Sequence, residues 1–260
     1  MVKFELKTIS KDKTRMTFLV KDATPGYANA LRRLMLSEVP VMAVEEVEIR
    51  KNSSAIFDEL VASRLGLLPL TTDLESYELP ASQQDIDDRK AKCTVQLTLK
   101  EKGPKTVYAS DLKSADPKIK PVYPKMILAK LLKDQELEVV AVATLGKGKD
   151  HAKWNPGHVW YNYSPSLKIN NKSKAIETFK SKYPSQIFNK KGEIDESLIL
   201  ENNLVDAVDH INDDIIKVEY SDKEFIFQVE SWGQLPVTEI VHQALVQFDG
   251  KLSELDSLIK

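Results

Sequence analysis

Residues 22–49 have the sequence DATPGYANALRRLMLSEVPVMAVEEVEI, and the rest of the chain is organised around this stretch. Thr24 is a favourable N-cap, and Pro25 suits the first helical turn, where its missing N–H needs no partner. Pro40 disfavours helical geometry in the residue before it, so the helix must end there. Alternating apolar residues over 41–49 then predict a strand. We therefore predict a short helix held between two strands.

This helix is apolar on one face and carries two adjacent arginines, Arg32 and Arg33, on another. The apolar residues recur at helical spacing: Tyr27, Leu31, Leu34 and Met35. A second seam closes the chain after Pro236, and its steps of three and four residues are nearly those of a heptad repeat. Its positions are Val237, Val241, Leu245, Phe248, Leu252, Leu255 and Ile259.

Most apolar helix faces simply cover their own core, but the terminal seam is longer than one domain needs, which favours partner binding. Each buried Leu or Met side chain contributes roughly 1.5–3 kcal/mol. Association costs on the order of 4–15 kcal/mol. The first helix alone is therefore too short to hold a dimer, whereas both seams together suffice.

Composition describes an ordinary globular chain of 260 residues, with 37 Lys+Arg against 39 Asp+Glu. Strong nonspecific nucleic-acid binding would need a concentrated positive face, which this balance does not indicate. No apolar run is long enough for a signal peptide core or a membrane span. Cys93 is the only cysteine, which excludes intrachain disulfides and thiolate metal sites and favours a cytoplasmic location.

Alternating and helical patterns predict the remaining elements in order. Residues 2–7 and 15–20 form a hairpin, and Gly66 ends a helix that starts near Phe57. An acidic loop (71–92) leads to strands at 95–99 and 107–108, a helix at 124–134, and a strand at 137–145 that is buried on both faces. Strands at 167–169 and 225–229 flank a polar segment, 171–214, with little core of its own. Residues 50–165 thus form an α+β unit.

Several motifs resemble parts of known binding or catalytic sites, but most of them lack residues that such a site needs. The loop GKGKDH (146–151) lacks the third glycine of a dinucleotide fingerprint and the ending of a P-loop. The triplet FDG (248–250) is followed by a lysine where two-metal catalysis would need a carboxylate. The four histidines are too scattered for a metal site. Lys147, Lys149 and Lys153 with Trp154 and Trp160 form either a nucleic-acid surface or a loop whose tryptophans pack on protein, and the second alternative is favoured.

Four separated blocks resemble one family along essentially the whole chain. They are NALRRLMLSEVPVMAVEEVEI, DELVASRLGLLPL, GKGKDHAKWNPGHVWY and FQVESWGQLPVTEIVHQAL. In this order they resemble the D subunit of archaeal DNA-directed RNA polymerase, the counterpart of the third-largest eukaryotic subunit and of the N-terminal domain of the bacterial alpha subunit.

The resemblance implies an α+β fold with a discontinuous dimerisation domain (1–48 and 165–260), an inserted α+β domain (49–164) and a small ferredoxin-like insert (171–214). It implies a non-catalytic scaffold in transcription. The chain would form a heterodimer with small subunit L through both helical seams, as a platform for small subunits N and P and the second-largest catalytic subunit. Arg32 and Arg33 are hypothesised to contact a large subunit, because arginine binds carboxylates in a bidentate manner.

One departure from the family concerns a cofactor. Many members hold an iron–sulfur cluster in the insert, but residues 171–214 contain no cysteine here, so we expect no cluster and no other cofactor. The insert should be held by Ile176, Phe179, Ile187, Phe188, Leu198, Leu204 and Val208. Two alternatives remain open: a stand-alone nucleic-acid-binding protein that uses the lysine–tryptophan loop, and a homodimeric structural protein.

Overall fold

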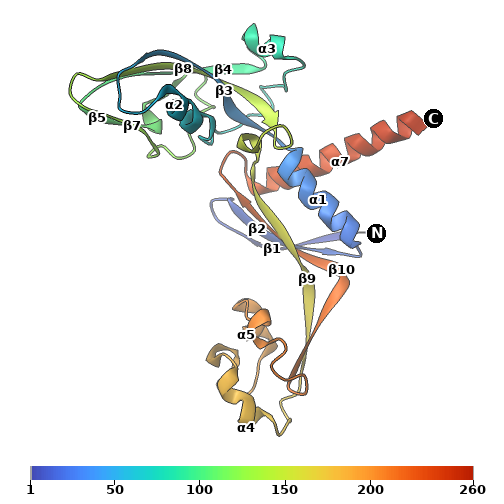
Figure 1. Ribbon diagram of the computed structural model, residues 1–260. Coiled ribbons are helices and arrows are strands. Elements are labelled where there is room, and N and C mark those ends of the chain that lie inside the picture. The colour runs from blue at the N-terminus through green and yellow to red at the C-terminus, as the bar shows by residue number, and fades with distance from the viewer. Residues whose placement is uncertain (1, 260) are drawn as a thin grey trace. The chain divides into compact units, whose positions relative to one another are not determined.

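The computed structural model describes residues 2–259 and has mixed α and β structure, which confirms the predicted α+β class (Figure 1). The chain forms two compact units, each made of discontinuous segments. The first contains Phe18–Ala28 and Tyr161–Phe227, and the second contains Asn29–Trp160 and the chain from Gln228 onward. The domain boundaries implied by the family resemblance stay a prediction.

A four-stranded sheet begins with the predicted hairpin, and its strand order is β1-β2-β10-β9. Its strands are β1 (Lys3–Ile9), β2 (Arg15–Lys21), β9 (Gly157–Ile169) and β10 (Ile216–Ser231). The turn between β1 and β2 is closed by the Ser10 hydroxyl, which accepts hydrogen bonds from the Thr14 amide at 3.1 Å and the Arg15 amide at 2.9 Å. Short polar residues favour such turns because their side chains bond nearby backbone amides.

Aromatic rings form a row across the part of this sheet that lies in the first unit. Phe18 stacks on Phe227 with ring centroids 5.1 Å apart, and Tyr161 contacts the same Phe227 ring at 5.3 Å. Phe4 approaches Phe18 at 6.0 Å. Phe227 is fully buried at the centre of this row. Because cross-strand side-chain pairs are the unit of sheet stabilisation, this ring ties three strands together.

The helix predicted around residues 24–39 is α1 (Pro25–Ser37), and its cap is confirmed. The Thr24 hydroxyl accepts a hydrogen bond from the Tyr27 amide at 3.2 Å. The strand predicted after Pro40 is β3 (Pro40–Asn52), whose first five residues are all buried. Its pairing register shifts between Val44 and Glu46, so Glu45 occupies a bulge.

The second sheet lies entirely in the second unit and has the strand order β3-β8-β4-β6. Its remaining strands are β4 (Thr94–Lys102), β6 (Lys113–Ser114) and β8 (Glu136–Lys147). The predicted burial of 137–145 on both faces is confirmed, since every residue from Val139 to Leu145 in β8 is buried. Helix α2 (Asp58–Gly66) adds Val61 and Leu65 to the core of this sheet. The buried single cysteine, Cys93, immediately precedes β4.

The predicted helix at 124–134 is wrong, because this segment contains the strand β7 (Ile127–Leu131). β7 pairs antiparallel with β5 (Lys105–Tyr108), and Leu128 and Leu131 are buried. Apolar residues at 127, 128, 131 and 132 suit a helix, but Ile127 and Leu132 are exposed. Backbone pairing with β5 therefore overrides the local pattern. In the predicted loop, a short helix α3 (Gln83–Asp87) also forms.

Residues 171–214 contain short helices around a small core of their own. These elements are α4 (Ile176–Phe179), α5 (Glu196–Glu201), α6 (Val205–Val208) and the 3₁₀ turns η3 (Lys180–Lys182) and η4 (Ser185–Ile187). Figure 1 shows α4 and α5 beside the ends of β9 and β10. Of the predicted core residues, Ile187 and Val208 are fully buried, while Ile176, Phe179, Phe188 and Leu204 pack around them. Leu198 lies outside this cluster, and its neighbour Ile199 is buried instead.

The terminal helix α7 (Val237–Ile259) follows Pro236 as predicted. Gly250 does not interrupt it. Val237, Ile240 and Ala244 are buried, whereas every residue over 249–259 is exposed. Within residues 2–259, no helix has the length and apolar character that a membrane span requires.

Candidate pairing surface

The second half of α7 (Figure 1, red helix) consists of exposed residues from Asp249 to Ile259, and several of them are apolar. Leu252 is 51% exposed, Leu255 52%, Leu258 77% and Ile259 76%. Residues 249–259 extend about 16 Å at the rise of an α-helix. A helical segment of this length is marginal in water unless its apolar face is packed. We call residues Leu252–Ile259 the exposed segment.

The ten residues predicted for the dimer interface fall into three groups. Leu31, Met35 and Val237 are fully buried within the chain, and Leu34 is nearly so. Tyr27, Val241, Leu245 and Phe248 are half-buried. Leu252 and Leu255 are exposed. Part of the two seams therefore belongs to the chain's own core, and part lies on the surface, where another molecule can contact it. The interface itself stays a prediction.

Arg32 and Arg33 lie in different environments although they are adjacent. The Arg32 guanidinium donates two hydrogen bonds to Asn29 Oδ1, at 3.2 and 2.9 Å, and the residue is half-buried. Arg33 is exposed, and its guanidinium makes no hydrogen bond or ion pair with any residue over 2–259. Arg33 is thus the better placed of the two for an external contact.

A buried carboxylate, Glu38, joins three elements of the second unit just after α1 ends. Its Oε2 lies 3.2 Å from Lys147 Nζ at the end of β8, and its Oε1 lies 2.8 Å from Lys251 Nζ on α7. Lys147 also donates to Gln247 Oε1 of α7 at 3.2 Å. Burial alone would raise the pKa of Glu38, but the hydrogen bonds from Lys251 and Lys147 outweigh it and lower the pKa. Glu38 is therefore held as a carboxylate.

The glycines of the GKGK loop serve close packing. A Cβ on Gly148 would lie 2.2 Å from the Leu36 carbonyl oxygen at the end of α1. A Cβ on Gly146 would lie 2.3 Å from the Trp154 ring. Lys147 forms an ion pair with Glu38, and both glycines make room for neighbouring atoms of the chain. The glycines and Lys147 are thus explained by packing and not by phosphate binding.

The lysine–tryptophan patch is largely occupied within the chain. Trp154, in the 3₁₀ turn η2 (Ala152–Trp154), is buried and its Nε1 donates to the Thr144 carbonyl at 3.3 Å. Lys153 lies over the Trp154 ring, with Nζ 4.3 Å from its centroid, and forms an ion pair with Glu45. These contacts favour the alternative in which the tryptophan packs on protein, since a stacking platform needs exposed rings.

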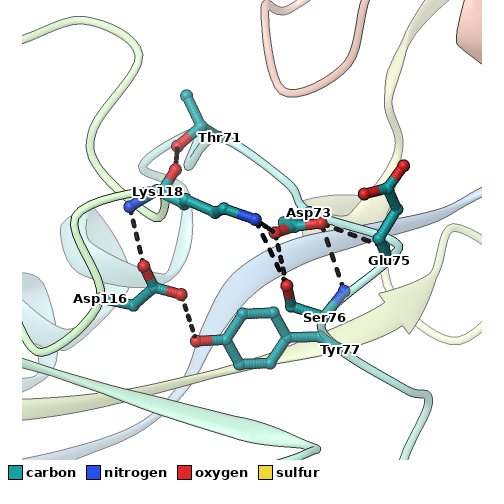
Figure 2. A network of polar contacts seen from close by, with 7 residues as sticks. All are labelled: Thr71, Asp73, Glu75, Ser76, Tyr77, Asp116 and Lys118. Carbon is teal, nitrogen blue, oxygen red and sulfur yellow. Dashed lines mark hydrogen bonds and ion pairs between the residues drawn. The ribbon is translucent and has the colours of Figure 1, made fainter.

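A polar network fixes the loop that follows α2 (Figure 2). Asp73 accepts hydrogen bonds from Lys118 Nζ at 2.6 Å, the Ser76 hydroxyl at 2.7 Å and the Glu75 amide at 3.0 Å. The Tyr77 hydroxyl donates to Asp116 at 2.8 Å. Burial and this hydrogen bond raise the pKa of Tyr77 to about 12. The side chains in Figure 2 thus join loop 71–77 to loop 116–120.

The network predicts acid sensitivity. Lys118 first, and then Ser76, hold the pKa of Asp73 below its ordinary value. A carboxylate with a lowered folded-state pKa stabilises the fold above its unfolded pKa of about 3.9 and loses that contribution as pH falls. We expect Asp73→Asn to lower the unfolding free energy by about 1 kcal/mol at pH 7 and to flatten its decline below pH 4. Urea unfolding from pH 7 to 2 measures this, with Asp88→Asn as the control. An equal decline in both proteins would contradict it.

No three His, Cys, Asp or Glu side chains gather in a metal-binding arrangement within residues 2–259. Sequence reasoning missed Leu258 as an exposed apolar residue, because it lies off the heptad seam. It also missed Glu38, since a single glutamate among many carries no periodic signal. The one local signal for Glu38 is its position at the predicted end of the helix, just before Val39-Pro40.

Comparison with known proteins identifies the family. Residues 47–158 match the model of the RNA polymerase Rpb3/RpoA insert domain. The DNA-directed RNA polymerase subunit Rpo3 of Pyrococcus furiosus is 40% identical over 99% of both chains. That of Thermococcus kodakarensis is 39% identical over 93% of this chain and 92% of its own. That of Natronomonas pharaonis is 33% identical over 98% of each. The chain thus belongs to the archaeal Rpo3 family of DNA-directed RNA polymerase subunits.

Proposed function

We propose that this chain is a non-catalytic assembly subunit that pairs with small subunit L of RNA polymerase. The pair would form the platform for subunits N and P and for the second-largest catalytic subunit. The exposed segment of α7 carries the proposal, because four exposed apolar side chains gathered on one helix are typical of a protein–protein interaction surface.

Energetics require the partner to contact more than this segment. Full burial of the remaining exposed area of its four apolar side chains would contribute about 4–8 kcal/mol. Association costs on the order of 4–15 kcal/mol. The half-buried residues Tyr27, Leu245 and Phe248 offer further area in the predicted interface. Pairing through both helices then becomes favourable, as the family resemblance implies.

The extent of the family match supports the proposed domain division. The family model covers residues 47–158, close to the proposed inserted domain at 49–164. The discontinuous dimerisation domain would comprise 1–48 and 165–260. It would contain α1 and α7, the two helices that carry the predicted interface.

We further propose that the insert at 171–214 holds no iron–sulfur cluster. A cluster needs several thiolates, and the single cysteine, Cys93, lies in the other compact unit. The apolar cluster around Ile187 and Ile199 supports this proposal, because it gives the insert a core that needs no metal. Purified protein should therefore contain less than about 0.1 iron per chain. Iron analysis and visible absorption measure this, and stoichiometric iron with a charge-transfer band would contradict it.

Co-expression with subunit L of the same organism tests the pairing. Native mass spectrometry should give a 1:1 complex of the two chains. A dimer of this chain alone would favour the homodimeric alternative. A monomer that binds DNA with steep salt dependence would favour the nucleic-acid alternative.

A further inference from the structure

Glu38 lies where a negative charge is unfavourable. Its amide donates to the Leu34 carbonyl at 3.0 Å, so the residue directly follows the last turn of α1. The C-terminal end of a helix carries partial negative charge and disfavours an anion. Glu38 is also only 6% exposed, which makes an uncompensated carboxylate costlier still. The lysine partners of Glu38 must therefore offset both effects.

Those partners fix α7 at two successive turns. Lys147 bridges Glu38 and Gln247, while Lys251 binds Glu38 directly. Gln247 and Lys251 are four residues apart, so they lie on one face of α7, one turn from each other. Lys147 itself is held in register opposite Pro40 at the end of the β3–β8 ladder. The carboxylate thus connects α7 to the end of the β3–β8 ladder.

The second of these turns coincides with a weak point in the helix. Gly250 lies in the interior of α7 and has no heavy atom within 4 Å of the position of a Cβ. Glycine disfavours helix more than any residue except proline. Lys251 follows Gly250 directly and precedes Leu252, the first residue of the exposed segment. The Glu38–Lys251 ion pair therefore holds α7 directly after Gly250. At this glycine the helix backbone itself restricts the direction of the following residues least.

We propose that Glu38 is a positioning residue: through Lys251 it fixes the direction in which the exposed segment Leu252–Ile259 leaves the fold. The proposal rests on the pairing function above. A partner that meets a fixed helix end does not have to order it, and pre-organisation of this kind raises affinity without any contact between Glu38 and the partner. Gly250 leaves the segment adjustable, and the ion pair selects one orientation.

Two substitutions separate this role from simple stabilisation. Lys251→Met removes the ion pair but keeps the aliphatic stem, and Lys251 is 50% exposed in its side chain, so the fold tolerates the change. Glu38→Gln keeps the shape of the side chain and removes its charge. Lys217→Met is the matched control, because among residues 2–259 Lys217 pairs only with Glu219, on its own strand, at 3.0 Å.

The first readout uses the chain alone, by hydrogen exchange of the amides over 250–259. We expect exchange in Lys251→Met and Glu38→Gln to be between about threefold and tenfold faster than in the wild type. Lys217→Met should leave it unchanged. Equal exchange rates in all four proteins would overturn the positioning role, whether or not subunit L binds.

The second readout is affinity for purified subunit L. Lys251→Met should weaken binding by about threefold to tenfold. Adding Gly250→Ala should restore it, because alanine stiffens the helix at the same point and has free space there. Unchanged affinity in Lys251→Met would overturn the proposal, as would a loss that Gly250→Ala does not restore. Failure of the wild-type chain to bind subunit L would instead refute the pairing function.

Discussion

The double variant Leu252→Glu, Leu255→Glu is expected to lose pairing with subunit L almost completely while the chain itself stays folded. Both leucines are about half exposed, so the substitutions remove little of the chain's own core. In a complex they would place two carboxylates in a desolvated seam, where an unpaired charge is strongly destabilising. We expect affinity to fall by at least about 100-fold. Isothermal titration calorimetry of the two purified subunits measures it.

The control for this experiment places the same charges on the other side of the helix. Ser253 and Ser257 are exposed and lie about half a turn from the leucine seam. Ser253→Glu, Ser257→Glu should pair with near wild-type affinity. If both double variants lost binding equally, long-range charge repulsion would explain the loss and the seam would be misplaced. Leu34 is a poorer test site because it is buried within the chain, so a charge there would disturb the fold first.

Phe227→Ala is expected to cause the largest loss of stability. Phe227 is fully buried and contacts the rings of Phe18 and Tyr161 from the two neighbouring strands. Truncation of such a ring costs about 3–5 kcal/mol, through lost burial and the cavity left behind. Chemical denaturation followed by circular dichroism should register this loss as an earlier unfolding transition.

Tyr163→Ala is the matched truncation within the same group of rings. Tyr163 contacts Phe225 at 5.2 Å but is 41% exposed. We expect a loss of about 1 kcal/mol, since less area is removed from contact and solvent fills the space. Comparable losses in the two variants would contradict the central role of Phe227 in this sheet.

The sequence predicts the ends of α1 and the first hairpin well because their signals are local. Thr24 caps α1 through the hydrogen bond that its hydroxyl accepts, and Pro40 ends the helix by restricting the residue before it. Ser10 closes its turn through its own hydroxyl. The strand β7 was missed because the pairing partner that determines its conformation, β5, lies some twenty residues earlier in the chain. A short apolar run is compatible with helix or strand until that partner is known.

The candidate site was only partly predictable for a related reason. The apolar seam of α7 is continuous from Val237 to Ile259, so periodicity alone cannot tell which part covers the chain's own core. The seam residues before Asp249 are buried or half-buried, and those after it are exposed. Likewise, the two glycines of the GKGK loop match a phosphate-binding motif only in part. The atoms that explain them are the Leu36 carbonyl oxygen, from a distant segment, and the nearby Trp154 ring, and the sequence pattern identifies neither contact.

The isolated thiol of Cys93 has a practical consequence. Cys93 is buried, and burial raises its pKa, so little reactive thiolate forms near neutral pH. A cysteine introduced at an exposed position such as Leu258 should therefore react with maleimide probes far faster than the native one. Fluorophores or spin labels placed on α7 should therefore meet little background labelling at Cys93, and the orientation of α7 can be measured without removing the native cysteine.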